Sequence, residues 1–77
     1  MKPPISGKEL LNILEKLGFE IIRVKGSHHF LQKGDLRTIV PVHNNRDLGS
    51  GLVLKILKDL KIDRKEFTKL RKKWENT

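Results

Sequence analysis

The chain has 77 residues, of which 36% are apolar and 34% charged; this indicates a compact globular domain and excludes an intrinsically disordered chain. Seventeen lysines and arginines oppose nine aspartates and glutamates, so the formal net charge is +8 and favours a polyanionic partner such as nucleic acid. The chain has no cysteine, no apolar run that would cross a bilayer and no signal-peptide pattern, so we expect a single cytoplasmic domain over residues 1–77, with no membrane partner.

The first predicted element is a helix that begins at Ser6. The Ser6 side chain is suited to cap the first turn, and Glu9 stands at the position from which a capping box reaches back. Gly18 supplies the C-terminal stop. Helical spacing predicts one apolar side for this helix, formed by Leu10, Ile13, Leu14 and Leu17.

Three β-strands are predicted to follow, separated by two short turns. The turns fall at Gly26-Ser27 and at residues 33–35, and the strands occupy residues 19–25, 28–33 and 36–42. Short turns of this kind join neighbouring antiparallel strands. Pro41 has no N–H to give to a ladder, so the third strand is expected at the sheet edge.

Two more helices complete the predicted fold. The second runs from Ser50 or Gly51 to about Lys61, and the third begins with a capping box at Asp63. The third carries an apolar series ringed by basic residues: Phe67, Leu70 and Trp74, with Lys69, Arg71, Lys72 and Lys73 around them.

The resulting order is α-β-β-β-α-α, with a three-stranded antiparallel sheet. A helix before the sheet and a helix returning onto one of its faces form a two-layer sandwich of the α+β class. The double-stranded-RNA-binding domain has this order, and one face of its sheet stays open. We therefore expect a fold like that domain.

Two adjacent histidines begin the second strand, and they point to opposite sides of the sheet. His28 shares a face with Phe30, and His29 shares the other with Leu31, so periodicity alone leaves open which histidine faces the helices. One reading is that one imidazole packs and the other is solvated. The other reading is that one imidazole moves protons while an RNA 2′-hydroxyl attacks its own phosphate. Cations for the developing charge are then Arg23, Lys25 and Arg37.

A metal site is the weaker interpretation of His28, His29 and His43. Neighbouring strand residues point apart, and no carboxylate lies at a usual ligand spacing. The chain also lacks a nucleotide-binding P-loop. We expect neither a metal ion nor a small-molecule cofactor.

Several of these segments together resemble the HicA (YcfA-like) toxin family. The resemblance runs over nearly the whole chain and rests on Lys25-Gly26-Ser27-His28-His29, then Thr38-Ile39-Val40-Pro41-Val42-His43, then Leu48-Gly49-Ser50-Gly51 before Ile56-Leu57-Lys58-Asp59. The chain departs from the family in having Leu31 where an aromatic residue is frequent, and in a longer basic third helix.

The resemblance implies an endoribonuclease toxin that cleaves mRNA, inhibits translation and is silenced by a HicB antitoxin. It implies that His28, directly after the Gly-Ser step, is the catalytic histidine. With Arg23, Lys25 and Arg37 from the strands, Ser27 completes the expected RNA-binding set. The competing hypothesis is a non-catalytic RNA-binding module of the same fold. A transcription factor is disfavoured because no helix offers an obvious set of base-reading side chains.

Overall fold

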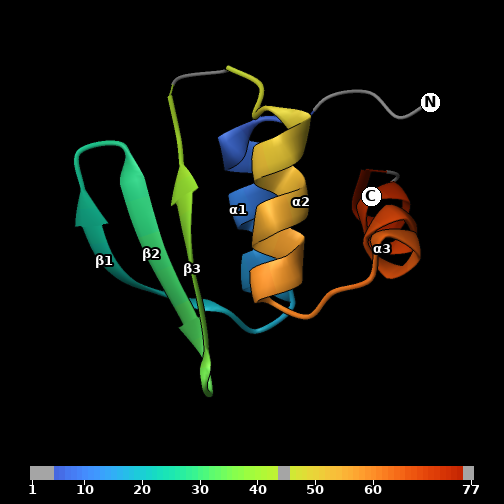
Figure 1. The fold of residues 1–77 in the computed structure, drawn as a ribbon, viewed down its shortest axis with the longest axis horizontal. Coiled ribbons are helices and arrows are strands. Elements are labelled where there is room, and N and C mark those ends of the chain that lie inside the picture. Colours follow the sequence, from blue (N-terminus) through green and yellow to red (C-terminus); the bar gives the residue numbers. More distant parts are fainter. Residues whose placement is uncertain (1–4, 44–45, 76–77) are drawn as a thin grey trace.

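The computed structural model describes residues 5–43 and 46–75, and its elements follow the predicted order (Figure 1). A three-stranded sheet lies on one side of α1 and α2, and α3 lies on the other side of these helices. The elements are α1 Gly7–Lys16, β1 Glu20–Lys25, β2 His28–Lys33, β3 Leu36–Pro41, α2 Ser50–Asp59 and α3 Arg64–Glu75. The α+β class and the antiparallel sheet are confirmed.

Helix α1 begins and ends as its sequence predicts. The Ser6 hydroxyl accepts a hydrogen bond from the Glu9 amide at 3.1 Å, which satisfies one of the free N–H groups of the first turn. Gly18 has a φ of +100°, a conformation that glycine adopts without steric cost. The capping box is nevertheless only half formed, because the Glu9 carboxylate binds Arg71 of α3 instead.

The sheet has the strand order β1-β2-β3, so β3 is an edge strand as its proline predicts. In the β2–β3 register Pro41 stands opposite His28. The Val42 amide donates to the Ser27 carbonyl oxygen at 2.8 Å, which extends the ladder by one residue pair. Hydrogen-bonded and non-hydrogen-bonded pairs alternate in an antiparallel ladder, so position 41 points its backbone nitrogen away from β2 and tolerates proline.

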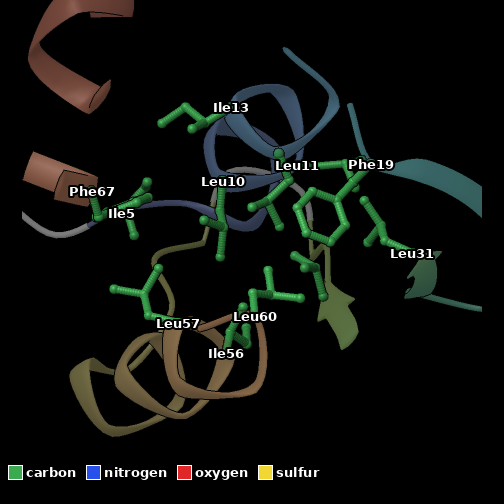
Figure 2. Packing of buried hydrophobic residues seen from close by; sticks show 12 residues of the cluster. Ile5, Leu10, Leu11, Ile13, Phe19, Leu31, Ile56, Leu57, Leu60 and Phe67 are labelled. Atoms are coloured by element: carbon green, nitrogen blue, oxygen red, sulfur yellow. The ribbon is translucent and has the colours of Figure 1, made fainter. Parts of the chain in front are cut away.

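The core forms where α1, α2 and one face of the sheet meet (Figure 2). Leu31 and Val40 are fully buried contributions from the sheet, and Leu10 and Leu14 are those from α1. Burying such side chains supplies most of the stabilisation of a domain this small. The remaining members of the cluster are Ile5, Leu11, Ile13, Phe19, Ile56, Leu57, Leu60 and Phe67.

The start of α1 is held against the end of β3. A Cβ atom at Gly7 would overlap the carbonyl oxygen of Pro41, so the two backbones meet at a distance that only glycine allows. Nearby, the Leu48 amide donates to the Ile5 carbonyl at 2.7 Å, and a β-bridge joins Ser6 to Asp47. These contacts fix both ends of the loop that follows β3.

Helix α3 is docked by an apolar residue and an ion pair. Phe67 is buried, and Arg71 Nε donates to Glu9 Oε2 at 2.8 Å. Arg71, one of the basic residues around the apolar series of this helix, therefore faces the rest of the domain, and its side chain is only 10% exposed. The predicted packing of Trp74 concerns a side chain outside the described part of the structure. In the described ranges, no helix is both long and apolar enough to cross a membrane.

Candidate active site

The burial of individual β2 residues shows which of the two adjacent histidines faces the helices. Leu31 is completely buried, so His29, which shares its face, points to the helical side and is half-buried. His28 is exposed on the opposite side, next to the half-buried Phe30. We call this opposite side the outer face; it carries Arg23, Lys25, His28, Phe30, Arg37 and Ile39.

Two of the predicted cations lie beside His28. Lys25 pairs with His28 across the β1–β2 ladder, and Arg23 pairs with Phe30, one step further along the same face. The Arg23 guanidinium carbon lies 5.9 Å from the centroid of the Phe30 ring, within the range of a cation–π contact. The exposed imidazole therefore has a lysine opposite it and an arginine diagonally across.

Arg37, the third predicted cation, is not beside the imidazole. It pairs with Gln32, which is four residues beyond His28 on the same strand. At about 3.3 Å per residue, this places the Arg37 backbone roughly 13 Å from that of His28 along the sheet. Arg37 is thus on the outer face but not beside His28.

Ser27 connects the other two histidines. Its hydroxyl lies 3.2 Å from His43 Nε2, and its carbonyl oxygen accepts a hydrogen bond from His29 Nδ1 at 3.1 Å. Ser27 was predicted as an RNA-binding residue; the structure places its hydroxyl on His43. No role for His43 was predicted from the sequence. The register of β2 and β3 was the signal that could have found it, because that register places residue 43 just beyond the last pair, near Ser27.

A hollow of about 360 Å³ is lined by α2 and by residues of both sheet faces, so α2 borders the outer face beside the edge strand β3. Its walls are mainly apolar, with Phe30 and Ile39 on the sheet side and Leu52 on the helix side. Arg37, Lys55 and Asp59 supply charged groups, and none of its lining residues is a histidine. The imidazoles consequently occupy an open sheet end, which suits a polymeric ligand better than an enclosed small molecule.

The metal-ligating side chains are dispersed. Among the residues with described positions, no three His, Asp or Glu side chains gather closely enough to hold an ion. His28 and His29 lie on opposite faces of β2, and His29 already donates through one ring nitrogen to the backbone.

Fold and site together define a small basic α+β domain whose open sheet end carries an exposed histidine among cations. A family model described as "HicA toxin of bacterial toxin-antitoxin" matches residues 7–62, which is more than half of the chain. The chain therefore belongs to the HicA toxin family, and the resemblance in its motifs is confirmed. No individually curated protein matches it. Helix α3 begins just beyond the matched residues.

Proposed function

We propose that the protein is an endoribonuclease toxin that cleaves mRNA without a metal ion and so inhibits translation. The observation that carries this proposal is the exposed imidazole of His28, with Lys25 directly across the ladder and Arg23 beside it. Membership of a toxin family supports the biological role. The net charge of +8 supports RNA as the substrate.

The proposed reaction is attack of an RNA 2′-hydroxyl on the adjacent phosphate. It requires a base for the hydroxyl proton, an acid for the leaving oxygen and cations for the charge on the phosphate. An imidazole serves in either proton role because its unperturbed pKa of about 6.5 lies near neutral pH. His28 transfers the proton, and the ammonium of Lys25 stabilises the developing negative charge.

The other predicted RNA-binding residues divide by position. Arg23 and Lys25 lie close enough to His28 to contact the phosphate that is cut, with Ser27 next to it in the chain. Arg37, farther along the outer face, contacts a neighbouring phosphate and fixes the register of the strand. This division predicts that Arg37 affects binding more than catalysis.

A toxin of this kind needs restraint, and we propose a HicB-like antitoxin as its partner in the cytoplasm. An acidic antitoxin surface complements the net positive charge and speeds association. Inhibition by occlusion requires that the partner cover His28 and the neighbouring cations. Diethylpyrocarbonate should then label His28 in the free protein and much less in the inhibited complex.

Cleavage of purified mRNA in excess EDTA tests the proposed activity. The wild-type protein and Gln32→Ala, a control on the same strand and face, should cut the RNA. His28→Ala should be slower by about 100-fold or more while it binds RNA with similar affinity.

Two results would contradict the proposal. If the wild-type protein binds RNA but does not cut it, the protein is an RNA-binding module. If EDTA stops cleavage and zinc or magnesium restores it, the metal-free mechanism is wrong.

A further inference from the structure

Resting on the proposed ribonuclease function, we infer that His43 is the second proton-transferring residue of the site and acts together with His28. The reaction needs both a base and an acid, and a single imidazole supplies only one of them at a time. Ser27 precedes His28 in the chain and is hydrogen-bonded to His29 and His43, so the structure has to distinguish which of these two joins His28.

Strand register brings His43 to the same end of the sheet as His28. Pro41 stands opposite His28, and the Val42–Ser27 hydrogen bond continues the ladder past Pro41. His43 lies two residues beyond Pro41, just past the end of β3, and continued alternation of the strand would bring it to the face of Pro41. Diagonal neighbours of this kind have backbones roughly 7–8 Å apart, within reach of a phosphate held between two imidazoles.

The contacts of the two remaining histidines set them apart. His29 points to the helical side, and its Nδ1 donates to a carbonyl oxygen, which accepts but never donates. His43 is exposed, and its Nε2 meets the Ser27 hydroxyl, which both donates and accepts. The hydroxyl therefore holds the His43 ring in its neutral and its protonated form, as a group that exchanges protons requires.

These two residues account for both protons that move in the reaction. The neutral imidazole takes the proton from the 2′-hydroxyl as the bond from O2′ to phosphorus forms. The protonated imidazole gives its proton to the 5′ oxygen as the bond from phosphorus to that oxygen breaks. The products are a 2′,3′-cyclic phosphate and a free 5′-hydroxyl, and water returns the two imidazoles to their starting protonation states.

His43→Gln tests this role, because the amide can still bind the Ser27 hydroxyl but does not titrate. We expect cleavage to slow by about 100-fold or more, with unchanged RNA affinity and melting temperature. The wild-type protein should show a bell-shaped pH–rate profile, and His43→Gln should lack one limb of it. A merely structural role for His43 would not remove a limb.

An RNA with sulfur in place of the leaving 5′ oxygen separates the two proton roles, because a thiolate leaves without a proton. Of His28→Ala and His43→Gln, the variant that lacks the acid should regain nearly the wild-type rate on this RNA, and the other should stay slow. A wild-type rate for His43→Gln on ordinary RNA, or rescue of neither variant, overturns the inference. Absence of cleavage by the wild-type protein overturns the proposed function itself.

Helix α3 carries an independent observation, from which we infer a second phosphate-binding surface. The helix has six basic and two acidic residues, a net charge of +4 within a chain of +8. At 3.6 residues per turn, Lys65, Lys69 and Lys72 fall on one side, opposite the buried Phe67 and Arg71. We call these three exposed lysines the α3 stripe.

The α3 stripe carries like charges close together on a docked helix. Phe67 and the Arg71–Glu9 pair dock α3 on its opposite side, so the lysines face solvent. Cations four residues apart on a helix repel each other, and a phosphate chain relieves that repulsion. Since α3 lies across the helices from the sheet (Figure 1), only an RNA long enough to pass around the domain reaches both surfaces.

A charge-matched pair of double variants tests the stripe in a His28→Ala background, in which RNA remains intact. Lys69→Gln/Lys72→Gln should weaken binding of a long single-stranded RNA severalfold and reduce the salt slope by about 0.7 for each lost phosphate contact. Lys58→Gln/Lys61→Asn, which removes the same charge elsewhere, should change both much less. A short RNA should bind both variants alike.

Equal affinity for the long RNA and equal salt slope in the two double variants would overturn the inference that the α3 stripe binds phosphates. Normal RNA binding combined with lost binding of an acidic antitoxin identifies it as a protein-docking surface instead. Loss of long-RNA binding in a protein whose wild-type form never cuts RNA would support the stripe while the proposed nuclease function fails.

Discussion

His28 and His29 are neighbours in the chain and have the same side chain, yet their surroundings differ in every respect that matters for chemistry. His28 is exposed on the outer face opposite Lys25. His29 is half-buried on the helical side and donates to the Ser27 carbonyl. A shift of one residue along a strand thus separates a group that meets solvent from a group that holds the backbone.

The same contrast extends to the two faces of the whole sheet. One face supplies the core through Leu31 and Val40, and the other keeps cations and an exposed imidazole. Substitutions on the core face should therefore act on stability, and those on the outer face on activity. Comparing substitutions on the two faces tests this division.

The largest expected effect is the difference between the two histidine variants. His28→Ala should lower the cleavage rate by about 100- to 10,000-fold and leave the free energy of unfolding nearly unchanged. His29→Ala should lower that free energy by about 1 kcal/mol, the contribution of one hydrogen bond, and keep cleavage within severalfold of wild type. Urea denaturation and RNA cleavage by the same preparations measure both quantities. If His29→Ala were the inactive variant, the assignment of the two faces would be reversed.

The next effect contrasts two apolar residues of neighbouring strands. Leu31→Ala removes a fully buried side chain and should cost about 2–5 kcal/mol of stability. Ile39→Ala, on the outer face and 43% exposed, should cost about 1 kcal/mol or less. The denaturant midpoints of the two variants, compared at equal m-value, measure the difference in stability. Equal losses would mean that the outer face is covered in solution.

The smallest expected effect concerns RNA affinity. Lys25→Gln/Arg37→Gln should weaken RNA binding alike for many sequences and lower the salt slope by about 0.7 for each lost contact. Lys33→Gln is the control, since its ammonium group donates to the Leu17 carbonyl at the other end of the sheet. Filter binding at several salt concentrations measures both. An unchanged slope in the double variant would exclude the outer face as the docking surface.

Local patterns predicted the elements of this fold well, since each depends on residues close together in sequence. Ser6 caps α1, the glycines at positions 26 and 34 adopt the positive φ that their turns need, and Pro41 lies on an edge strand. The identity of the residue to test, His28, came from the motif that surrounds it. Whether it faces the solvent did not, because apolar residues occur on both faces of β2.

Contacts between distant residues were beyond local patterns. Glu9 had a plausible capping role within its own helix, but the docking of α3 brought Arg71 within 2.8 Å, and a charge-assisted hydrogen bond with a side chain that is nearly buried prevails. The contact of Ser27 with His43 likewise depends on the strand register. Neither the Glu9–Arg71 pair nor the Ser27–His43 contact can be predicted from composition or helical spacing.

The close approach of Gly7 to Pro41 bears on how this toxin would lose its toxicity under selection. Every replacement of a glycine adds at least a Cβ atom, and at position 7 that atom meets backbone rather than a side chain able to turn aside. The strain reaches the end of β3, two residues from His43. Position 7 is therefore a target at which any amino-acid change should appear among spontaneous survivors of toxin expression, although it is far in sequence from every residue assigned to the chemistry.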